Sequence, residues 1–255
     1  MIQIVVPMAG LGSRFATAGF ELPKPLIDVA GRPMIEVVIE NLRPRRPHRF
    51  VFVVQREQVD GFGLDSLLGE WAPGCEVVSI DGLTAGAACT VLRARDHLEP
   101  ELPLMVANCD QWLDADVESY LAHFDGSAVD GFLMTMPADH PKWSYVQLDD
   151  RGWVRRVVEK EVVSNMATVG VYNWTRAGDF TVAAEAMIYA ERRVNGEFYV
   201  APVYQEMIER GAHVEAFDVD CDGQAMYGLG TPEDLADFVA GDGSKRLQAR
   251  QALRV

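Results

Sequence analysis

The sequence predicts an α/β fold with a mostly parallel central sheet, and three observations support this prediction. Short runs of β-branched and other apolar residues alternate with segments whose apolar residues recur at helical spacing. The first run, residues 2–6, consists of β-branched apolar residues except for Gln3, as in a strand that is buried on both faces of a sheet. The run at 102–108 leads directly into an aspartate, at the place where open α/β sheets bind their ligands.

The first 125 residues are expected to form strand–helix–strand units. Strands are expected at 2–6, 50–54, 77–80 and 102–108, and helices at 34–42, 57–68, 84–92 and 117–124. Either Asp114 or Asp116 is expected to cap the last of these helices, because apolar residues at helical spacing follow from Val117.

The second half is expected to contain more antiparallel pairing. A polar turn at 149–152 separates two alternating runs, which predicts a hairpin. Strands are expected at 132–136, 145–148, 154–158, 167–172 and 214–219, and helices at 176–189 and 203–208. A last helix is expected to be capped by Thr231, with Pro232 at its first position. Residues 241–255 are expected to form a tail that frays.

The composition excludes several classes of protein. A formal net charge of −15 argues against a nucleic-acid partner, because such binding depends largely on a basic face. No apolar run approaches the roughly 20 residues that span a bilayer, so no membrane partner is expected. Met1 leads directly into the first strand without a basic leader, so we expect a cytoplasmic protein. The four cysteines are far apart, which indicates neither a zinc knuckle nor a disulfide framework.

Residues 7–25 contain two motifs that suit phosphate binding. After the break at Pro7, a loop carries Gly10, Gly12 and Arg14. Glycines allow the backbone N–H groups to approach an anion closely, and the arginine adds a fork of donors. Lys24 then stands between two prolines, whose restricted backbone limits where the ammonium can point.

Two other glycine-rich motifs do not fit this loop. The dinucleotide-binding fingerprint needs a third glycine where this chain has Phe15, and the Gly-Lys-Ser/Thr of a P-loop is absent. An ordinary strand-to-helix turn remains the alternative interpretation.

Together, Gly-x-Gly-x-Arg and Pro-Lys-Pro resemble the signature of the sugar-1-phosphate nucleotidylyltransferases, the nucleotidyltransferase family that makes nucleotide-sugars. The resemblance implies a Rossmann-like three-layer α/β/α fold with a mixed, mostly parallel sheet. It implies one domain over 1–240, whose halves, about 1–125 and 126–240, bind the nucleotide and the acceptor. It also implies catalytic roles for Arg14 and Lys24, and a loop around the triphosphate made by Ala9, Gly10, Leu11, Gly12 and Ser13.

The resemblance extends to the base and to a metal ion. Gly86 and Ala87 lie in a small-residue turn that covers the nucleobase in the family, although a tightly packed helix start is the alternative. Asn108 and Asp110 match a family triplet whose aspartate binds metal, which implies Mg²⁺ as cofactor; for Asp110, a helix cap is the alternative. Many relatives have a second aspartate where this chain has Gly228; Asp220 or Asp222 would be the substitute, and we name Asp222.

The acceptor is expected to bind to the second half of the chain. The resemblance implies that Glu159, Lys160, Gly170 and Glu197 bind its ring, hydroxyls and phosphate. An exposed ion pair at a strand end is the alternative for Glu159 and Lys160.

The expected reaction joins a nucleoside triphosphate to a phosphorylated small molecule and releases pyrophosphate. The sequence looks most like a subgroup found in surface-polysaccharide (capsule) biosynthesis, near phosphoglutamine cytidylyltransferases, so a sugar-1-phosphate and a phosphoglutamine-like acceptor both stay open. The triphosphate can be CTP, UTP or dTTP. A homo-oligomer is also possible. Two rival functions are a glycosyltransferase, for which Asp114 and Asp116 have the metal-motif spacing, and a non-catalytic nucleotide-sensing subunit.

Overall fold

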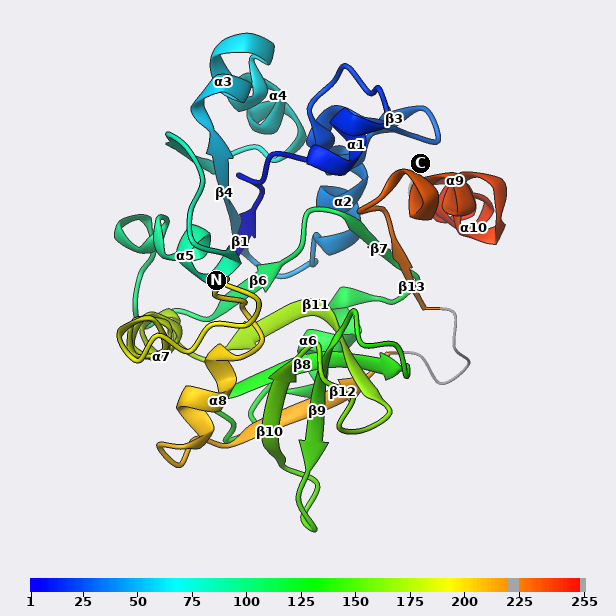
Figure 1. Cartoon of the computed structure of the whole chain (residues 1–255). Coiled ribbons are helices and arrows are strands. Elements are labelled where there is room, and N and C mark those ends of the chain that lie inside the picture. The colour runs from blue at the N-terminus through cyan, green and yellow to red at the C-terminus, as the bar shows by residue number, and fades with distance from the viewer. Residues whose placement is uncertain (220–224, 253–255) are drawn as a thin grey trace.

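The computed structural model describes residues 1–219 and 225–252, and within these residues nine strands form one mixed sheet (Figure 1). The order is β10-β9-β11-β6-β1-β4-β5, and β8 joins β11 to β12. The strands are β1 (Ile2–Pro7), β4 (His48–Gln55), β5 (Glu76–Ile80), β6 (Leu104–Ala107), β8 (Gly131–Pro137), β9 (Ser144–Leu148), β10 (Val154–Glu159), β11 (Met166–Trp174) and β12 (Val214–Asp218). The expected α/β fold is confirmed.

The first half of the chain, about residues 1–125, contains the parallel part of the sheet around β1. β1 pairs in parallel with both β4 and β6, and β4 pairs in parallel with β5. Successive residues of β1 point to opposite faces, so Ile4 and Val6 enter one core while Val5 enters the other. The apolar residues on both sides of this strand therefore reflect burial on both faces, and Gln3 is the one polar residue of β1.

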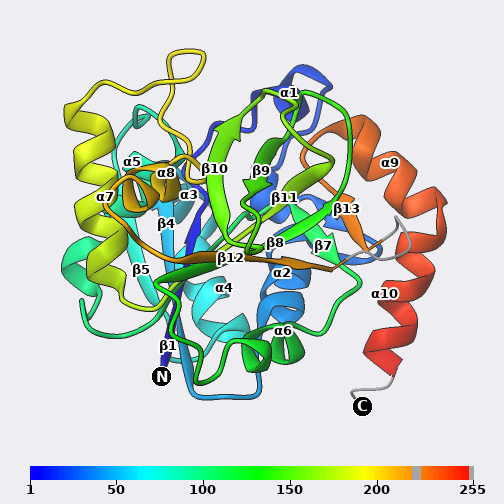
Figure 2. The ribbon, with the colours of Figure 1, turned by 90° about the horizontal axis from the view of Figure 1, so that it is seen from below.

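Helices cover both faces of the sheet. Residues of α2, α4 and α6 pack in one core, and residues of α5, α7 and α8 pack in the other, which gives the three layers. Figures 1 and 2 agree that α7 and α8 lie on one side of the molecule and α9 and α10 on the opposite side. The helices are α1 (Ser13–Thr17), α2 (Met34–Leu42), α3 (Arg56–Phe62), α4 (Leu64–Trp71), α5 (Ala87–Leu92), α6 (Val117–His123), α7 (Ala177–Tyr189), α8 (Val203–Ile208), α9 (Pro232–Ala240) and α10 (Asp242–Ala252), with 3₁₀ turns η1 (Lys24–Leu26) and η2 (Arg95–His97). In the described part of the chain, no helix is long and apolar enough to cross a membrane.

The second half of the chain, about residues 126–240, has more antiparallel pairing, as expected. β11 runs antiparallel to β6, β8 and β9, and β9 and β10 form the expected hairpin. The two helix caps are confirmed as well. Asp116, rather than Asp114, accepts a hydrogen bond from the Glu118 N–H at the start of α6, and Thr231 accepts one from the Asp234 N–H at the start of α9.

Two helix predictions were wrong. The helix expected at 57–68 is two helices, because Gly63 adopts a left-handed conformation (φ +61°) that ends α3 and starts α4. Residues 242–252 form α10 instead of a frayed tail. Arg246 and Arg250 both bind the Asp114 carboxylate, at 2.7 and 2.9 Å, and Leu247 is buried.

Two short two-stranded sheets were not predicted. β2 (Asp28–Val29) pairs with β3 (Arg32–Pro33), and β7 (Gln111–Leu113) pairs with β13 (Met226–Gly228). The second pair brings the chain after residue 225 beside Asp110, where the Leu229 N–H donates to the Asp110 carbonyl at 2.8 Å. A third apolar cluster, which includes Phe15, Trp112 and Leu247, joins α9 and α10 to the loop after β1.

Candidate active site

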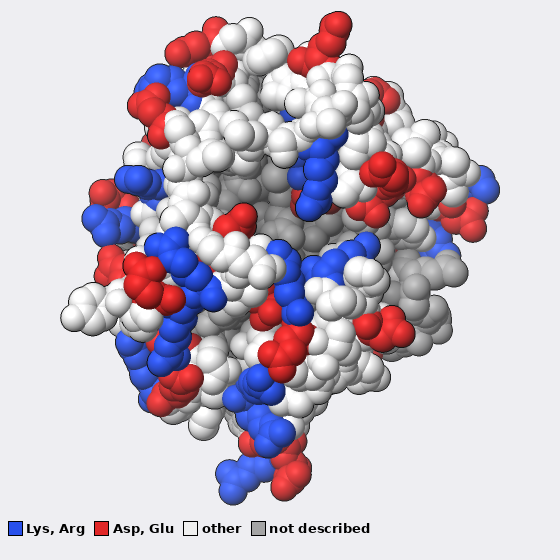
Figure 3. Space-filling model, viewed as in Figure 1, with Lys and Arg blue, Asp and Glu red and all other residues white. Residues whose placement is uncertain are grey.

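A cavity of about 680 Å³ opens where β1, β5 and β6 end, and the segment after α7 also lines it. Figure 3 shows the hollow between the two halves of the molecule, with Lys and Arg side chains at its rim. Lys24 and Arg193 line the cavity together with Asp110 and Glu197, so two basic and two acidic side chains face it. In a chain with 38 acidic and 23 basic residues, even a few cations held in one cleft suit a small polyanion.

The two motifs that are predicted to bind phosphate are in contact in this cavity. Gly12 has a left-handed backbone (φ +62°), and a Cβ atom added there would lie 2.9 Å from the Cβ of Lys24. Gly10 faces open space, with no other atom within 4 Å of an added Cβ. Ala9, Leu11 and Ser13 line the same cavity. The structure therefore brings together the glycine loop and the proline-flanked lysine, as the sequence predicts.

The Lys24 ammonium donates a hydrogen bond to the Asp110 carboxylate, 86 residues away in sequence. Burial lowers the pKa of Lys24, but the charge and hydrogen bond of Asp110 together with Cys109 outweigh it, and the net shift is upward. Lys24 is therefore charged at neutral pH. Arg14 is exposed and lies close enough to Lys24 to interact with its charge, and among the described residues it forms no ion pair.

Gly86 and Ala87 line the cavity at the start of α5. Gly86 has φ +135°, and an added Cβ would lie 2.5 Å from the backbone N and O of Phe198. The Phe198 N–H donates to the Ala85 carbonyl, and the Ala88 N–H donates to the Phe198 carbonyl. Tight packing thus requires glycine at position 86, and the same packing places the segment around Phe198 on the cavity wall.

Asn108 and Asp110 line the cavity at the end of β6. The Asn108 N–H donates to the Gly170 carbonyl at 3.0 Å, and Gly170 has φ +72°. A side chain at Gly170 would collide with the Asn108 amide, so Gly170 lies behind Asn108 and leaves room for it. The acceptor contact assigned to Gly170 stays a prediction.

The remaining acceptor candidates form one group. Lys160 follows β10 with a left-handed backbone (φ +58°), which is rare for a residue with a side chain. Its ammonium donates to the Tyr199 hydroxyl and lies 4.5 Å from the centre of the Tyr199 ring. Tyr199 and Glu197 line the cavity. Glu159 accepts a hydrogen bond from Ser144, and burial raises the pKa of Glu159, with Glu197 adding to the shift. Glu159 and Lys160 thus have different partners, unlike an exposed ion pair.

Comparisons with known proteins agree with this geometry. The model of the nucleotidyl transferase family matches residues 4–242. The chain belongs to this family. A bifunctional protein GlmU of Paraburkholderia phymatum is 27% identical over 242 residues, which cover 93% of this chain and 51% of that protein. This nucleotidyl transferase therefore spans about half the length of the curated relatives it matches.

Solved structures share the fold of this nucleotidyl transferase. A nucleoside-diphosphate-sugar pyrophosphorylase from Vibrio cholerae superposes with a TM-score of 0.77 at 21% identity, covering 93% of this chain and all of the other. An inositol-1-phosphate CTP transferase from T. maritima superposes with a TM-score of 0.70 at 17% identity, covering 97% and 96%.

Sequence reasoning did not identify Arg193 and Tyr199 as residues of the nucleotidyl transferase cavity. Both line it. Left-handed backbone at Glu191, Asn195 and Gly196 folds this segment back, and the Arg193 guanidinium lies 4.2 Å from the centre of the Phe198 ring. The Asn-Gly pair was the only local signal of this turn, because Arg193 is one of nineteen arginines.

The predicted metal site is only partly present. Among the described residues, no three His, Cys, Asp or Glu side chains form a metal-binding group, and Asp222 lies outside these residues. Mg²⁺ usually binds one or two carboxylates and takes its other ligands from phosphates and water. Asp110 can supply one carboxylate. Because Gly230 has no side chain, space is left beside the Oδ2 atom of Asp110. The residues fit a metal held mainly by its substrate.

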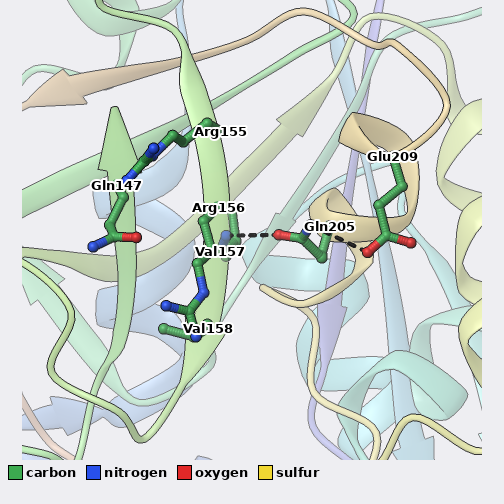
Figure 4. Close-up of a pocket in the computed structure, with 7 residues that line it drawn as sticks. All are labelled: Gln147, Arg155, Arg156, Val157, Val158, Gln205 and Glu209. Carbon is green, nitrogen blue, oxygen red and sulfur yellow. Dashed lines mark hydrogen bonds between the residues drawn. The ribbon is translucent and has the colours of Figure 1, made fainter. Parts of the chain in front are cut away.

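A second cavity, of about 590 Å³, lies along the outer edge of β10 beside α8 (Figure 4). There the Val157 N–H donates to the Gln205 side chain at 3.1 Å, and Arg155 and Arg156 lie on the same strand. A bulge between β10 and β9 accompanies these arginines. Charged residues, bulges and side-chain caps are common ways to protect the edge of a sheet, and we interpret this groove as such a protected edge.

Proposed function

We propose that this nucleotidyl transferase joins a nucleoside triphosphate to a phosphorylated small molecule and releases pyrophosphate. The contact between Gly12 and Lys24, with Lys24 bound to Asp110, carries the proposal. It places a backbone loop suited to phosphate, a charged lysine and a carboxylate in one cavity.

The reaction would be an in-line attack of an acceptor phosphate oxygen on the α-phosphorus of the triphosphate. This oxygen is ionised at neutral pH, so the enzyme needs no general base, and catalysis depends on positioning and on charge neutralisation. Lys24 and Arg14 would neutralise the phosphates, while Ala9, Gly10, Leu11, Gly12 and Ser13 enclose them. Gly86, Ala87 and Asn108 would contact the nucleoside. When a triphosphate binds, Lys24 would shift from Asp110 toward the phosphate oxygens.

Members of this family generally use a divalent metal ion. We propose Mg²⁺ here, held by Asp110 together with phosphate and water oxygens. Mg²⁺ would supply additional positive charge at the phosphates. Releasing Asp110 from Lys24 would make its carboxylate available for this role.

The acceptor would bind on the side of Glu159, Lys160 and Glu197, with Gly170 behind the cavity wall. Lys160 and Arg193 are the cations on that side, and we propose that they hold the acceptor phosphate. Glu159 and Glu197 would accept hydrogen bonds from its hydroxyl or amino groups.

The acceptor would be a sugar-1-phosphate or a phosphoglutamine-like phosphate, and CTP, UTP and dTTP are the candidate triphosphates. Structural neighbours include a CTP transferase and a UTP-bound enzyme, so they do not favour one base. We further propose that the protein acts in the cytoplasm in the synthesis of a surface polysaccharide. We also propose that it forms a homo-oligomer, which light scattering would test.

A pyrophosphate-release screen tests the proposal. The four common ribonucleoside triphosphates and dTTP would each be combined with sugar-1-phosphates and phosphorylated amino acids, with Lys24→Ala as the control. Release that needs one triphosphate, one acceptor and Lys24 is the expected result. Free nucleoside diphosphate from a nucleotide-sugar would instead indicate a glycosyltransferase. Tight nucleotide binding without pyrophosphate release would indicate a sensing subunit.

A further inference from the structure

Gln55 joins the two loops that form the nucleotide side of the cavity. It is the last residue of β4, it is buried, and β4 lies between β1 and β5 in the sheet. Its Nε2 atom donates to the Ala9 carbonyl at 2.5 Å and to the Gly82 carbonyl at 3.0 Å. Ala9 belongs to the loop after β1 and Gly82 to the loop after β5, so one amide group connects both.

Each of these loops carries an exposed leucine one or two residues after the anchored carbonyl. Leu11 is 65% exposed and Leu83 is 63% exposed, and both line the cavity. Because both leucines line one cavity, they offer a bound ligand apolar surface to cover. The flat faces of a nucleobase are apolar enough to cover them.

We propose that Gln55 is a positioning residue that fixes the distance between the two loops, so that Leu11 and Leu83 contact the nucleoside of the bound triphosphate. The inference rests on the proposed function. Only a primary amide suits the position, because its two N–H donors can serve two carbonyl oxygens without burying a charge. Methionine has similar length but no donor, and an ionised glutamate would face two carbonyl oxygens with a negative charge.

Nucleotide affinity without acceptor tests this proposal directly. Calorimetric titration of the wild-type protein with each triphosphate in the presence of Mg²⁺ gives the reference Kd. We expect Gln55→Met to weaken nucleotide binding about tenfold, whereas the KM of the acceptor changes less than twofold. Gln3→Met is the matched control, because Gln3 is also buried and donates from Nε2 to the Glu99 carbonyl at 3.0 Å near the start of β1. It should lose stability but keep the wild-type Kd.

A pH series separates positioning from general loss of packing. The neutral carboxyl group of Gln55→Glu can donate one hydrogen bond, whereas the ionised group can donate none. Nucleotide affinity of Gln55→Glu relative to wild type should therefore rise as the pH is lowered from 8 to 5.5. The relative affinity of Gln55→Met should stay flat over the same range.

The leucines keep the proposal testable if the Gln55 variants do not fold. Leu11→Ala and Leu83→Ala remove exposed side chains, so they should fold normally, and each should weaken nucleotide binding about fivefold. Wild-type affinity in both leucine variants, or in a folded Gln55→Met protein, would overturn the inference alone. Wild-type protein that binds none of the triphosphates would overturn the proposed function together with it.

Discussion

The cavity at the strand ends and the groove along β10 have similar volumes, about 680 and 590 Å³, but very different chemistry. The loops after β1, β5 and β6 and the segment after α7 contribute to the first, and they bring residues from positions 7 to 199 together. The second is lined by two adjacent strands and one helix. Volume therefore does not identify the functional site; the convergence of loops at the carboxyl ends of parallel strands does.

The ion pairs of the cavity and of the groove also differ in how far they are buried. The Lys24 and Asp110 side chains are 18% and 28% exposed, and they bind each other. In the groove, Arg156 is 44% exposed and Glu209 is 46% exposed, and each is paired with a neighbour at the surface. Water and salt screen the exposed pairs, so these pairs contribute little to stability. The partly buried pair is screened less and can act on a ligand at close range.

Asp110→Asn should give the largest effect in the cleft. If Asp110 holds the metal ion, its loss should lower kcat/KM more than about a thousandfold, or roughly 4 kcal/mol of barrier. Mn²⁺ binding in the presence of nucleotide, followed by paramagnetic resonance, should weaken in parallel. Asp125→Asn removes an exposed carboxylate bound to Arg46 and is the control. Unchanged metal dependence in Asp110→Asn would refute the ligand role.

Lys24→Ala should lower kcat at least about a hundredfold, which corresponds to roughly 2.7 kcal/mol of barrier. The lysine neutralises charge at the reacting phosphates, and its removal should not unfold the protein. Steady-state pyrophosphate release and a thermal melt measure the two quantities. Lys245→Ala, which removes an exposed lysine of α10 bound to Asp242, should retain wild-type kinetics. Wild-type activity in Lys24→Ala would exclude this lysine from the mechanism.

Gly12→Ala should lower activity at least about tenfold, or about 1.4 kcal/mol. The new Cβ would press on the Lys24 side chain and move the loop. Gly74→Ala is the control, because Gly74 also has a left-handed backbone (φ +80°) but no atom near an added Cβ. Both variants should lose about 1 kcal/mol of stability in a denaturant titration, from backbone strain. Equal activity of the two variants would show that the Gly12–Lys24 contact is unimportant.

The contact between Gly12 and Lys24 could be predicted because each residue belongs to a motif with restricted backbone, and the motifs are close in sequence. The packing of the third apolar cluster could not be predicted in this way. Arg246 binds Asp114 across 132 residues, and β13 pairs with β7 across more than 100 residues, so no local sequence pattern predicts either contact. Arg193 was missed for the same reason, because a strained turn places it rather than a periodic element.

Glu159 and Glu209 should show opposite pH dependence of stability. Burial raises the pKa of Glu159, so the unfolded chain releases this proton first and stability falls as pH rises above about 4.5. Arg192 lowers the pKa of Glu209, so its contribution is present at neutral pH and is lost as pH falls below about 4.5. At pH 7, Glu159→Gln should therefore raise the melting temperature and Glu209→Gln should lower it. Melts from pH 4 to 8 that show the same sign for both variants would contradict this contrast.

Replacing Arg155 and Arg156 together by alanine should have the smallest effect on catalysis. Both side chains lie on the edge strand, and exposed charges of this kind usually change stability by no more than about 0.5 kcal/mol. We expect kcat/KM within about twofold of wild type. The edge strand should associate more readily without its charges, which light scattering during prolonged incubation at low salt would detect. A loss of activity comparable with that of Lys24→Ala would instead make the groove part of the functional site, and it would remove the distinction between the two cavities.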